Sequence, residues 1–172
     1  MKLRPLQNSD LGLVGNWLSQ KQNYEWLDFE NGPQILTPTT LKIMMQRDTH
    51  LLRLFAPDSQ NPPVGLVALG NINRKFKTAM PWCVLGNKDY NGQGLASRAV
   101  SAILSVAFSE LGLEAVNAWT VAENRPAIRV LEHNHFRLIG NQRRCHYIDG
   151  RPYDRLLFDL LASEHKENGY CE

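Results

Sequence analysis

The sequence predicts a single α/β domain in which a mixed, mostly antiparallel sheet surrounds one parallel β-α-β unit and carries flanking helices. The chain has 172 residues, 43% of them hydrophobic, which suffices for one sizeable core. Apolar runs with strand-like alternation are interspersed with segments of helical periodicity. One of these runs leads through a glycine-rich turn into a long amphipathic helix, the order expected of a β-α-β unit.

The N-terminal part predicts a short strand and two helices. Residues 2–6 favour an edge strand, because a proline within them removes a backbone donor. Ser9 or Asp10 is suited to cap the first helix. The second helix is expected to begin at Thr37 and Pro38, which suit the N-cap and the first helical position.

Three apolar runs follow and predict three strands. Residues 50–55 and 64–69 flank a polar, proline-rich loop at 57–63, which indicates a hairpin. The third run, residues 79–85, leads directly into the glycine-rich turn. These strands are expected to form the first part of the sheet.

The longest helix is predicted from Ala96 to Leu111, where small and apolar residues recur at helical spacing. Gly112 is suited to end it, and residues 115–121 form the next apolar run. The strands before and after this helix should therefore be parallel, with a right-handed crossover.

The C-terminal part predicts one more helix and a closing hairpin. The helix begins near residue 124, where a proline suits its first turn. Strands are expected at 136–140, 143–148 and 154–160. Residues 149–153 predict a turn between the last two strands that is longer than a two-residue hairpin loop.

Composition limits the range of functions. We assign residues 1–162 to the domain and residues 163–172 to a polar tail. A net charge of +2 from 19 basic and 17 acidic residues is too balanced for a nucleic-acid binder. The three cysteines lack disulfide or zinc spacing, and no run approaches the roughly 18 apolar residues of a membrane span. These features favour the cytoplasm, without a membrane partner.

The turn from Tyr90 to Ser97 is the strongest functional signal. Gly92 and Gly94 tolerate positive φ and leave no Cβ in the way, so successive N–H groups can point into one concavity. The turn precedes a helix N-terminus, where anions bind. A phosphate site and a plain strand-to-helix connection are the two interpretations of this turn.

The order of elements and two motifs resemble the GCN5-related N-acetyltransferase (GNAT) superfamily. The segment from Asn91 to Ala96 is similar to its Arg/Gln-x-x-Gly-x-Gly/Ala pattern, with Asn91 in the place of Arg or Gln. The segment from Asn124 to Phe136 resembles its Asn-x-x-Ala/Ser helix. The ends of the chain are similar to the subgroup of ribosomal-protein N-terminal acetyltransferases, which includes enzymes acting on the L7/L12 stalk protein.

The resemblance implies acetyl-CoA as cofactor. It places the pyrophosphate on the backbone of the turn and the pantetheine arm along the preceding strand. For Asn124, contact with the cofactor and capping of the helix are both open. The implied coenzyme A contacts are Cys83, Val84, Leu85, Asn91, Gly92, Gln93, Gly94, Leu95, Ala96, Ser97 and Asn124.

The implied activity is direct acetyl transfer to a primary amine, either a protein N-terminus or a small molecule. The alternative is an acyl-CoA-binding regulatory module, because Leu131 and Ala127 occupy the positions where the family carries a Tyr or a Ser as general acid. An acyl-enzyme on Cys83 is the less favoured route, because a cysteine in an apolar strand is usually inert.

His146 is the predicted general base, because an imidazole titrates near neutrality and takes the place of a family Glu. A packing role is the competing interpretation. His133 and His135 point apart on a helix, so no metal is expected. The chain is expected to be a monomer or a homodimer. The predicted acceptor site consists of Tyr24, Trp26, Asp28, Asp149 and Tyr153.

Overall fold

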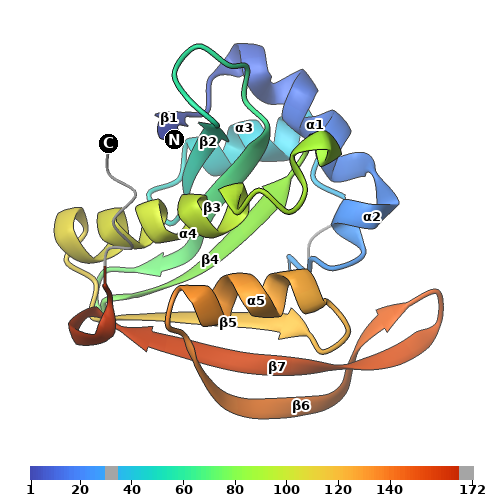
Figure 1. The fold of residues 1–172 in the computed structure, drawn as a ribbon, viewed down its shortest axis with the longest axis vertical. Helices are drawn as coiled ribbons and strands as arrows, with labels where there is room; N and C mark the ends of the chain where they lie inside the picture. The colour runs from blue at the N-terminus through green and yellow to red at the C-terminus, as the bar shows by residue number, and fades with distance from the viewer. Residues whose placement is uncertain (30–34, 167–172) are drawn as a thin grey trace.

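The computed structural model describes residues 1–29 and 35–166. Within them, seven strands form one mixed sheet in the order β1-β2-β3-β4-β5-β7-β6 (Figure 1). The strands are β1 Lys2–Pro5, β2 Leu51–Ala56, β3 Gly65–Asn73, β4 Thr78–Leu85, β5 Ala115–Val121, β6 Arg137–Ile148 and β7 Arg151–Leu161. The helices are α1 Leu11–Ser19, α2 Lys21–Tyr24, α3 Pro38–Met45, α4 Leu95–Ser105 and α5 Arg125–His133.

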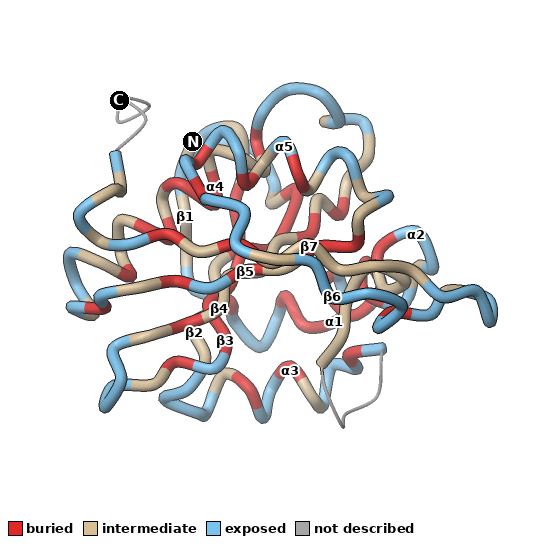
Figure 2. The backbone as a smooth tube through the Cα atoms, turned by 90° about the horizontal axis from the view of Figure 1, so that it is seen from below, coloured by how far each residue is buried: buried red, intermediate tan, exposed pale blue. Residues whose placement is uncertain are grey.

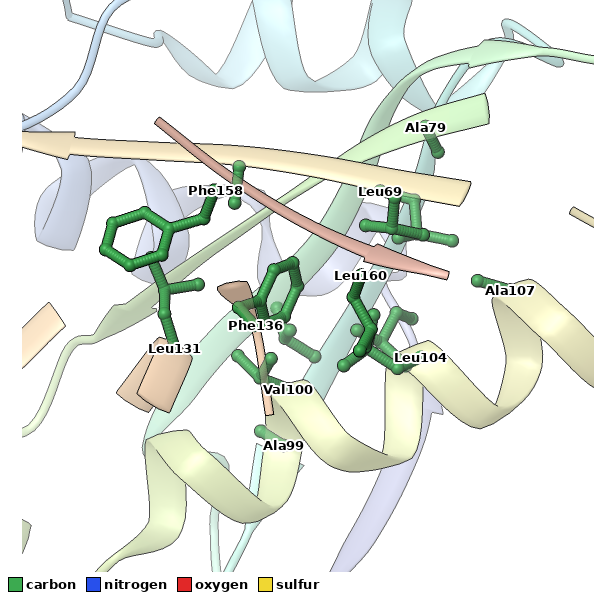
Figure 3. Packing of buried hydrophobic residues seen from close by; sticks show 14 of the residues in the cluster. Leu69, Ala79, Ala99, Val100, Leu104, Ala107, Leu131, Phe136, Phe158 and Leu160 are labelled. Carbon is green, nitrogen blue, oxygen red and sulfur yellow. The ribbon is translucent and has the colours of Figure 1, made fainter. Parts of the chain in front are cut away.

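Both faces of the sheet are covered, as the continuous buried run of β3 requires. In β3, Val67 and Leu69 pack with α4 and α5, whereas Leu66 and Ala68 pack with α1 and α3. Figure 3 shows the first of these two clusters, and the buried stretches of Figure 2 run through the sheet between the exposed outer helix faces. Helices therefore flank a mixed sheet on both sides, and the predicted single α/β domain with one parallel β-α-β unit is confirmed.

The parallel pair in the middle of the sheet is short. β4 and β5 pair only at Thr78 with Ala115 and at Ala79 with Val116. Beyond these residues the strands separate, while β4 stays paired with β3 as far as Leu85 (Figure 1). Pro81 lies just past the last pair and has no N–H to continue the ladder. The sheet therefore opens toward the carboxyl ends of β4 and β5.

The predicted helix starts are correct in position but differ in chemistry. Thr37 accepts a hydrogen bond from the Thr40 N–H at 3.2 Å, as an N-cap should. Asp10 stands at the N-cap of α1 but does not cap it. Its carboxylate instead accepts from the Arg4 guanidinium and from the Gln7 N–H.

The closing hairpin differs from the sequence prediction. β6 is one continuous strand with register shifts rather than two separate strands, and it pairs with β7 from Arg137 to Ile148. The turn has two residues, Asp149 and Gly150, with φ of 50° and 75°. The prediction of a longer loop was wrong because positive φ at both positions allows a tight primed turn. Pro152 then lies within a paired strand at the sheet edge.

The C-terminal residues begin by packing on the domain. After β7, residues 162–164 form a 3₁₀ turn. The His165 ring lies 3.0 Å from the Ser105 hydroxyl and contacts the Phe108 ring. The rest of the predicted tail, residues 167–172 with Cys171, lies outside the described residues.

Candidate active site

A cavity of about 1400 Å³ occupies the opening between β4 and β5. Its walls come from the end of β4, the turn at 90–97, the first turns of α4 and α5, and the middle of β5. On the opposite side, residues 26–29 and the α3 helix close it. Segments distant in sequence therefore meet at the split in the sheet, where open α/β folds bind ligands.

All of the predicted coenzyme A contacts line this cavity, as do Trp26 and Asp28 from the predicted acceptor site. Tyr24, His146, Asp149 and Tyr153 are not among the lining residues. The structure thus brings the predicted donor contacts together and divides the predicted acceptor site.

The glycine turn presents free backbone donors to the cavity. Gly94 is left-handed, with φ of 71°, and precedes the first residue of α4. The first bond inside this helix runs from the Arg98 N–H to the Gly94 carbonyl at 3.0 Å. The N–H groups of Leu95, Ala96 and Ser97 therefore have no intrahelical acceptor. With the helix dipole, they fit a diphosphate.

A side-chain contact fixes the start of α4 against the end of α5. The Asn134 amide nitrogen donates to the Ser97 carbonyl at 3.1 Å and to the Ser97 hydroxyl at 3.2 Å. It also donates to the Val130 carbonyl at 2.8 Å. Asn134 is buried, so this connection is shielded from water.

The open edge of β4 offers a second kind of binding surface. From Met80 onward, β4 has no pairing with β5, so backbone groups on this side remain available. An extended chain carrying amides, such as a pantetheine arm, can occupy this edge as an added strand does. Together with the turn, this edge fits the shape and chemistry of coenzyme A.

Cys83 lines the cavity, but its thiol is not reactive. Burial raises the pKa of the Cys83 thiol to about 12, and the nearby Lys88 opposes this only in part. The thiol is therefore protonated at neutral pH, and only the thiolate is a good nucleophile. This environment argues against an acyl-enzyme.

The α5 side of the cavity has no proton donor at the two family positions. Ala127 and Leu131 both line the cavity, and neither side chain can donate a proton. Asn124 accepts from the Ala127 N–H at 3.3 Å, so it caps α5 while it also lines the cavity. The two roles considered for Asn124 are compatible.

His146 lies behind the cavity wall. Its side chain is buried, and Nε2 donates to the Glu25 carbonyl at 2.7 Å. Nδ1 accepts from Arg155 Nη2 at 3.0 Å. Both ring nitrogens are therefore engaged in hydrogen bonds within the protein. This geometry does not favour proton transfer to a substrate.

Arg155 connects His146 to the cavity. Its Nη2 also donates to Asp28 Oδ2 at 2.5 Å, and its guanidinium stacks on the Trp119 ring at 4.0 Å. Arg155, Asp28 and Trp119 all line the cavity. We call Asp28, Trp119, His146 and Arg155 the Arg155 cluster. It ties residues 25–28 to β5, β6 and β7.

The other predicted acceptor residues lie elsewhere. Asp149 is exposed in the hairpin turn and pairs with Lys21 at 2.6 Å. Tyr153 stands opposite His146 in the β6–β7 ladder, and Tyr24 ends α2. Side chains alternate between the two faces of a strand, so the face of each residue can be assigned only when the pairing register is known. The sequence alone does not give this register.

Several polar groups of the cavity escaped sequence reasoning. Lys88 donates to Asn23 Oδ1 at 2.5 Å and to the Leu85 carbonyl at 2.8 Å, and burial lowers its pKa. His50 also lines the cavity, and burial, followed by the charge of Arg47, lowers the pKa of its imidazole. Neither residue belongs to a recognisable motif.

Two negative findings concern the part of the chain that the structure describes. No group of three or more His, Cys, Asp or Glu side chains there is placed to hold a metal ion. No helix in that part is long and apolar enough to cross a membrane.

A helix led by glycines, beside a sheet split between two parallel strands, offers a site for a ligand that carries phosphate groups on an extended arm. The chain belongs to the GNAT acetyltransferase family, because the model of the acetyltransferase (GNAT) domain matches residues 1–137. The family resemblance seen in the sequence is thereby confirmed.

Known proteins agree with this assignment. A prophage-derived, uncharacterized N-acetyltransferase of Bacillus subtilis, YokL, is 28% identical over 116 residues, or 67% of this chain and 65% of the relative. Spermidine N-acetyltransferase from Vibrio cholerae, solved with CoA and spermine, has a TM-score of 0.83 at 22% identity and covers 95% of this chain and 96% of its own. Ribosomal-protein-S5-alanine acetyltransferase from Vibrio fischeri has a TM-score of 0.77 at 20% identity, and the match covers 95% of this chain and 94% of that protein. These two structures share the fold.

Proposed function

We propose that this protein is an acetyl-CoA-dependent N-acetyltransferase that moves an acetyl group directly to a primary amine. The observation that carries the proposal is the convergence of all predicted donor contacts on one cavity at the split between β4 and β5. Isothermal titration with acetyl-CoA tests the donor site. A folded sample that shows no heat of binding would contradict it.

In this proposal, the N–H groups of the first turn of α4 hold the pyrophosphate, and the open edge of β4 aligns the pantetheine arm. Acetyl-CoA supplies an activated acyl group, and the amine attacks it without a covalent enzyme intermediate because the Cys83 thiol stays protonated. A leaving thiol has a pKa near ~8.5, so water can protonate it in place of an acid on α5.

We propose a positioning role for His146 in place of the predicted role as base. Its two hydrogen bonds hold the Glu25 carbonyl and orient Arg155 toward Asp28. His50 is one of two histidines, with His133, among the described residues that line the cavity, and its Nδ1 lies 2.9 Å from the Thr49 hydroxyl. Because its pKa is lowered, His50 is neutral at pH 7 and can accept a proton from an acceptor amine.

The charges of the cavity limit the acceptor. Among the described lining residues, Asp28 is the carboxylate, and it is already paired with Arg155. The same described lining carries the cations Arg47, Arg98, Arg129 and Arg155. A polyamine would bring further positive charge into this environment at an electrostatic cost. We therefore propose an acceptor with one amine and no second cationic group beside it.

A panel of acceptors tests this assignment by the release of free coenzyme A thiol. Peptides with a free N-terminus and monoamines carrying a carboxylate are expected to be acetylated. Spermidine, the substrate named for the Vibrio cholerae relative, is expected to react poorly here. Efficient turnover of spermidine would contradict the proposed acceptor class and leave the donor site intact.

An acyl-CoA-binding module without catalysis is the second candidate. The specific observation in its favour is that Ala127 and Leu131 stand where the family carries a proton donor. In that case acetyl-CoA binds, but no amine in the panel releases thiol. The two candidates therefore differ in turnover and agree in binding.

We also propose a cytoplasmic location, supported by free thiols at Cys83 and Cys145, which are typical of reducing compartments. A monomer or a homodimer remains our proposal for assembly. Strand β6, at one of the two edges of the sheet, exposes Leu138 and Ile139 and is the surface where a second copy would add. Light scattering on the purified protein distinguishes the two states.

A further inference from the structure

Lys88 places a primary amine inside the cavity that we assign to acetyl-CoA. The residue follows β4 and lies in a short 3₁₀ turn before the glycine turn. Its side chain folds back, so that Nζ donates to the carbonyl of Leu85 at 2.8 Å and to Asn23 Oδ1 at 2.5 Å. Leu85 is one of the residues proposed to contact the pantetheine arm. The Lys88 amine thus lies beside the proposed path of the donor.

An uncharged amine can make both contacts of Lys88 Nζ. A neutral lysine has two N–H hydrogens and one lone pair, whereas the ammonium form has three hydrogens to donate. The two acceptors, Asn23 Oδ1 and the Leu85 carbonyl, use both hydrogens of the neutral form and leave its lone pair unoccupied by them.

The surroundings of Lys88 also favour loss of its proton. Asn23 is buried, and its amide nitrogen is fixed by the Trp17 carbonyl at 2.8 Å, so its oxygen is held toward Lys88. Neither acceptor carries a charge. Burial lowers the pKa of the Lys88 amine, while the neighbouring Cys83 raises it to a lesser extent.

We propose that Lys88 is a self-acetylation site, at which the protein transfers an acetyl group from bound acetyl-CoA to its own Nζ. This inference rests on the proposed donor site. In the step, Nζ forms a bond to the acyl carbon and the C–S bond of the thioester breaks. The proton lost by nitrogen leaves with coenzyme A as its thiol, so no further reactant is needed.

Acetylation of Lys88 changes the cavity in two ways. It converts a potential cation into a neutral amide, and it leaves Nζ with one N–H for two acceptors. The added acetyl group also occupies space next to Asn23 and Leu85. Modified protein is therefore expected to turn over an external amine more slowly. Acetylation of Lys88 would thus inhibit the protein when acceptor is scarce.

Purified protein incubated with acetyl-CoA, without any acceptor, tests the proposal. Intact-mass measurement should show the gain of one acetyl group, and peptide mapping should place it on Lys88. The rate should reach half of its maximum at the acetyl-CoA concentration that half-saturates the protein in isothermal titration. An excess of free coenzyme A should suppress it.

Two variants complete the experiment. Lys88→Arg should abolish the modification while coenzyme A still binds, and Lys75→Arg, at an exposed lysine outside the cavity, should leave it unchanged. The proposal is wrong if coenzyme A binds and Lys88 stays unmodified. It is also wrong if acetylation spreads over exposed lysines in proportion to acetyl-CoA concentration. Failure of coenzyme A to bind would instead remove the proposed donor site, and this inference with it.

Discussion

The proposed donor side and the proposed acceptor side of the cavity are formed by different kinds of chemical group. The donor side consists mainly of backbone, namely the glycine turn, the first turn of α4 and the open edge of β4. The acceptor side consists of side chains from residues 26–29, α3 and β7, held by the Arg155 cluster. A backbone site depends on conformation, whereas a side-chain site depends on which residues distant segments bring together. The two sides should therefore respond differently to substitution.

The largest effect is expected at Gly94, where φ is 71°. Gly94→Ala should cost about 1–2 kcal/mol of stability through left-handed strain. It should also weaken coenzyme A binding by about tenfold or more, because relief of the strain moves the N–H groups of α4; tenfold corresponds to about 1.4 kcal/mol. Calorimetry and isothermal titration measure the two effects.

Gly112→Ala is the matched control, because its φ is 63° and an added Cβ meets nothing within 4 Å, as at Gly94. It lies outside the cavity lining, so it should lose similar stability and keep its affinity for coenzyme A. Equal affinities of the two variants would show that the turn does not hold the donor.

A smaller effect is expected on the acceptor side at Arg155. Arg155→Met removes the Arg155 hydrogen bonds to Asp28 Oδ2 and His146 Nδ1, which should cost about 1–3 kcal/mol of stability. The acceptor KM should rise while coenzyme A affinity is retained. Lys21→Met removes the exposed ion pair with Asp149 and serves as the control. It should change neither the stability nor the acceptor KM measurably. A large loss of coenzyme A affinity in Arg155→Met would contradict the separation of the donor side from the acceptor side.

His146→Gln should have a weaker effect, about 1 kcal/mol, because it perturbs hydrogen bonds of the Arg155 cluster without removing its charges. We expect a higher acceptor KM with little change in kcat or in its pH profile. A general base would behave otherwise, with a loss of about 10²- to 10⁴-fold in kcat. Steady-state kinetics on an accepted amine decides between a positioning role and a base.

The smallest effect concerns pH and His50. Because burial lowers its folded-state pKa, the unfolded chain binds this proton more readily, and stability should fall as pH drops below about 6.5. His50→Gln should remove that part of the pH dependence. Unfolding midpoints of both proteins between pH 7.5 and pH 5.5 measure it, at roughly one pKa unit on either side of the ordinary histidine value. Identical profiles would contradict the burial of this imidazole.

The same contrast explains what the sequence could predict. Gly92, Gly94 and the Asn124 helix start carry local signals, because positive φ and helix capping depend on neighbours in the chain. The donor contacts followed from these signals and the family resemblance. The contacts of His146 with Glu25, 121 residues away, depend on the register of β6 and on where α2 ends, and no local pattern encodes either.

Lys88 was missed for a related reason. Its position after an apolar strand is typical of a solvent-exposed lysine. Only the fold places Asn23 beside it. The two-residue turn of the closing hairpin was missed because the sequence pattern placed all of residues 149–153 in one loop, although an edge strand tolerates Pro152. Both errors concern tertiary placement and not composition.

The short ladder between β4 and β5 also has a mechanical consequence. Two register pairs connect the halves of the sheet, and the packing of α4 on both halves provides the rest of their cohesion. The amide hydrogens that point into the gap, on β4 beyond Ala79 and on β5 beyond Val116, should exchange quickly with solvent in the free protein, whereas those bonded to β3 or β7 should exchange slowly. An extended ligand in the gap would bond to strand edges that are otherwise open and slow this exchange. The donor would then act as a removable strand of the sheet, and its arrival would stiffen the domain along the line where it is weakest.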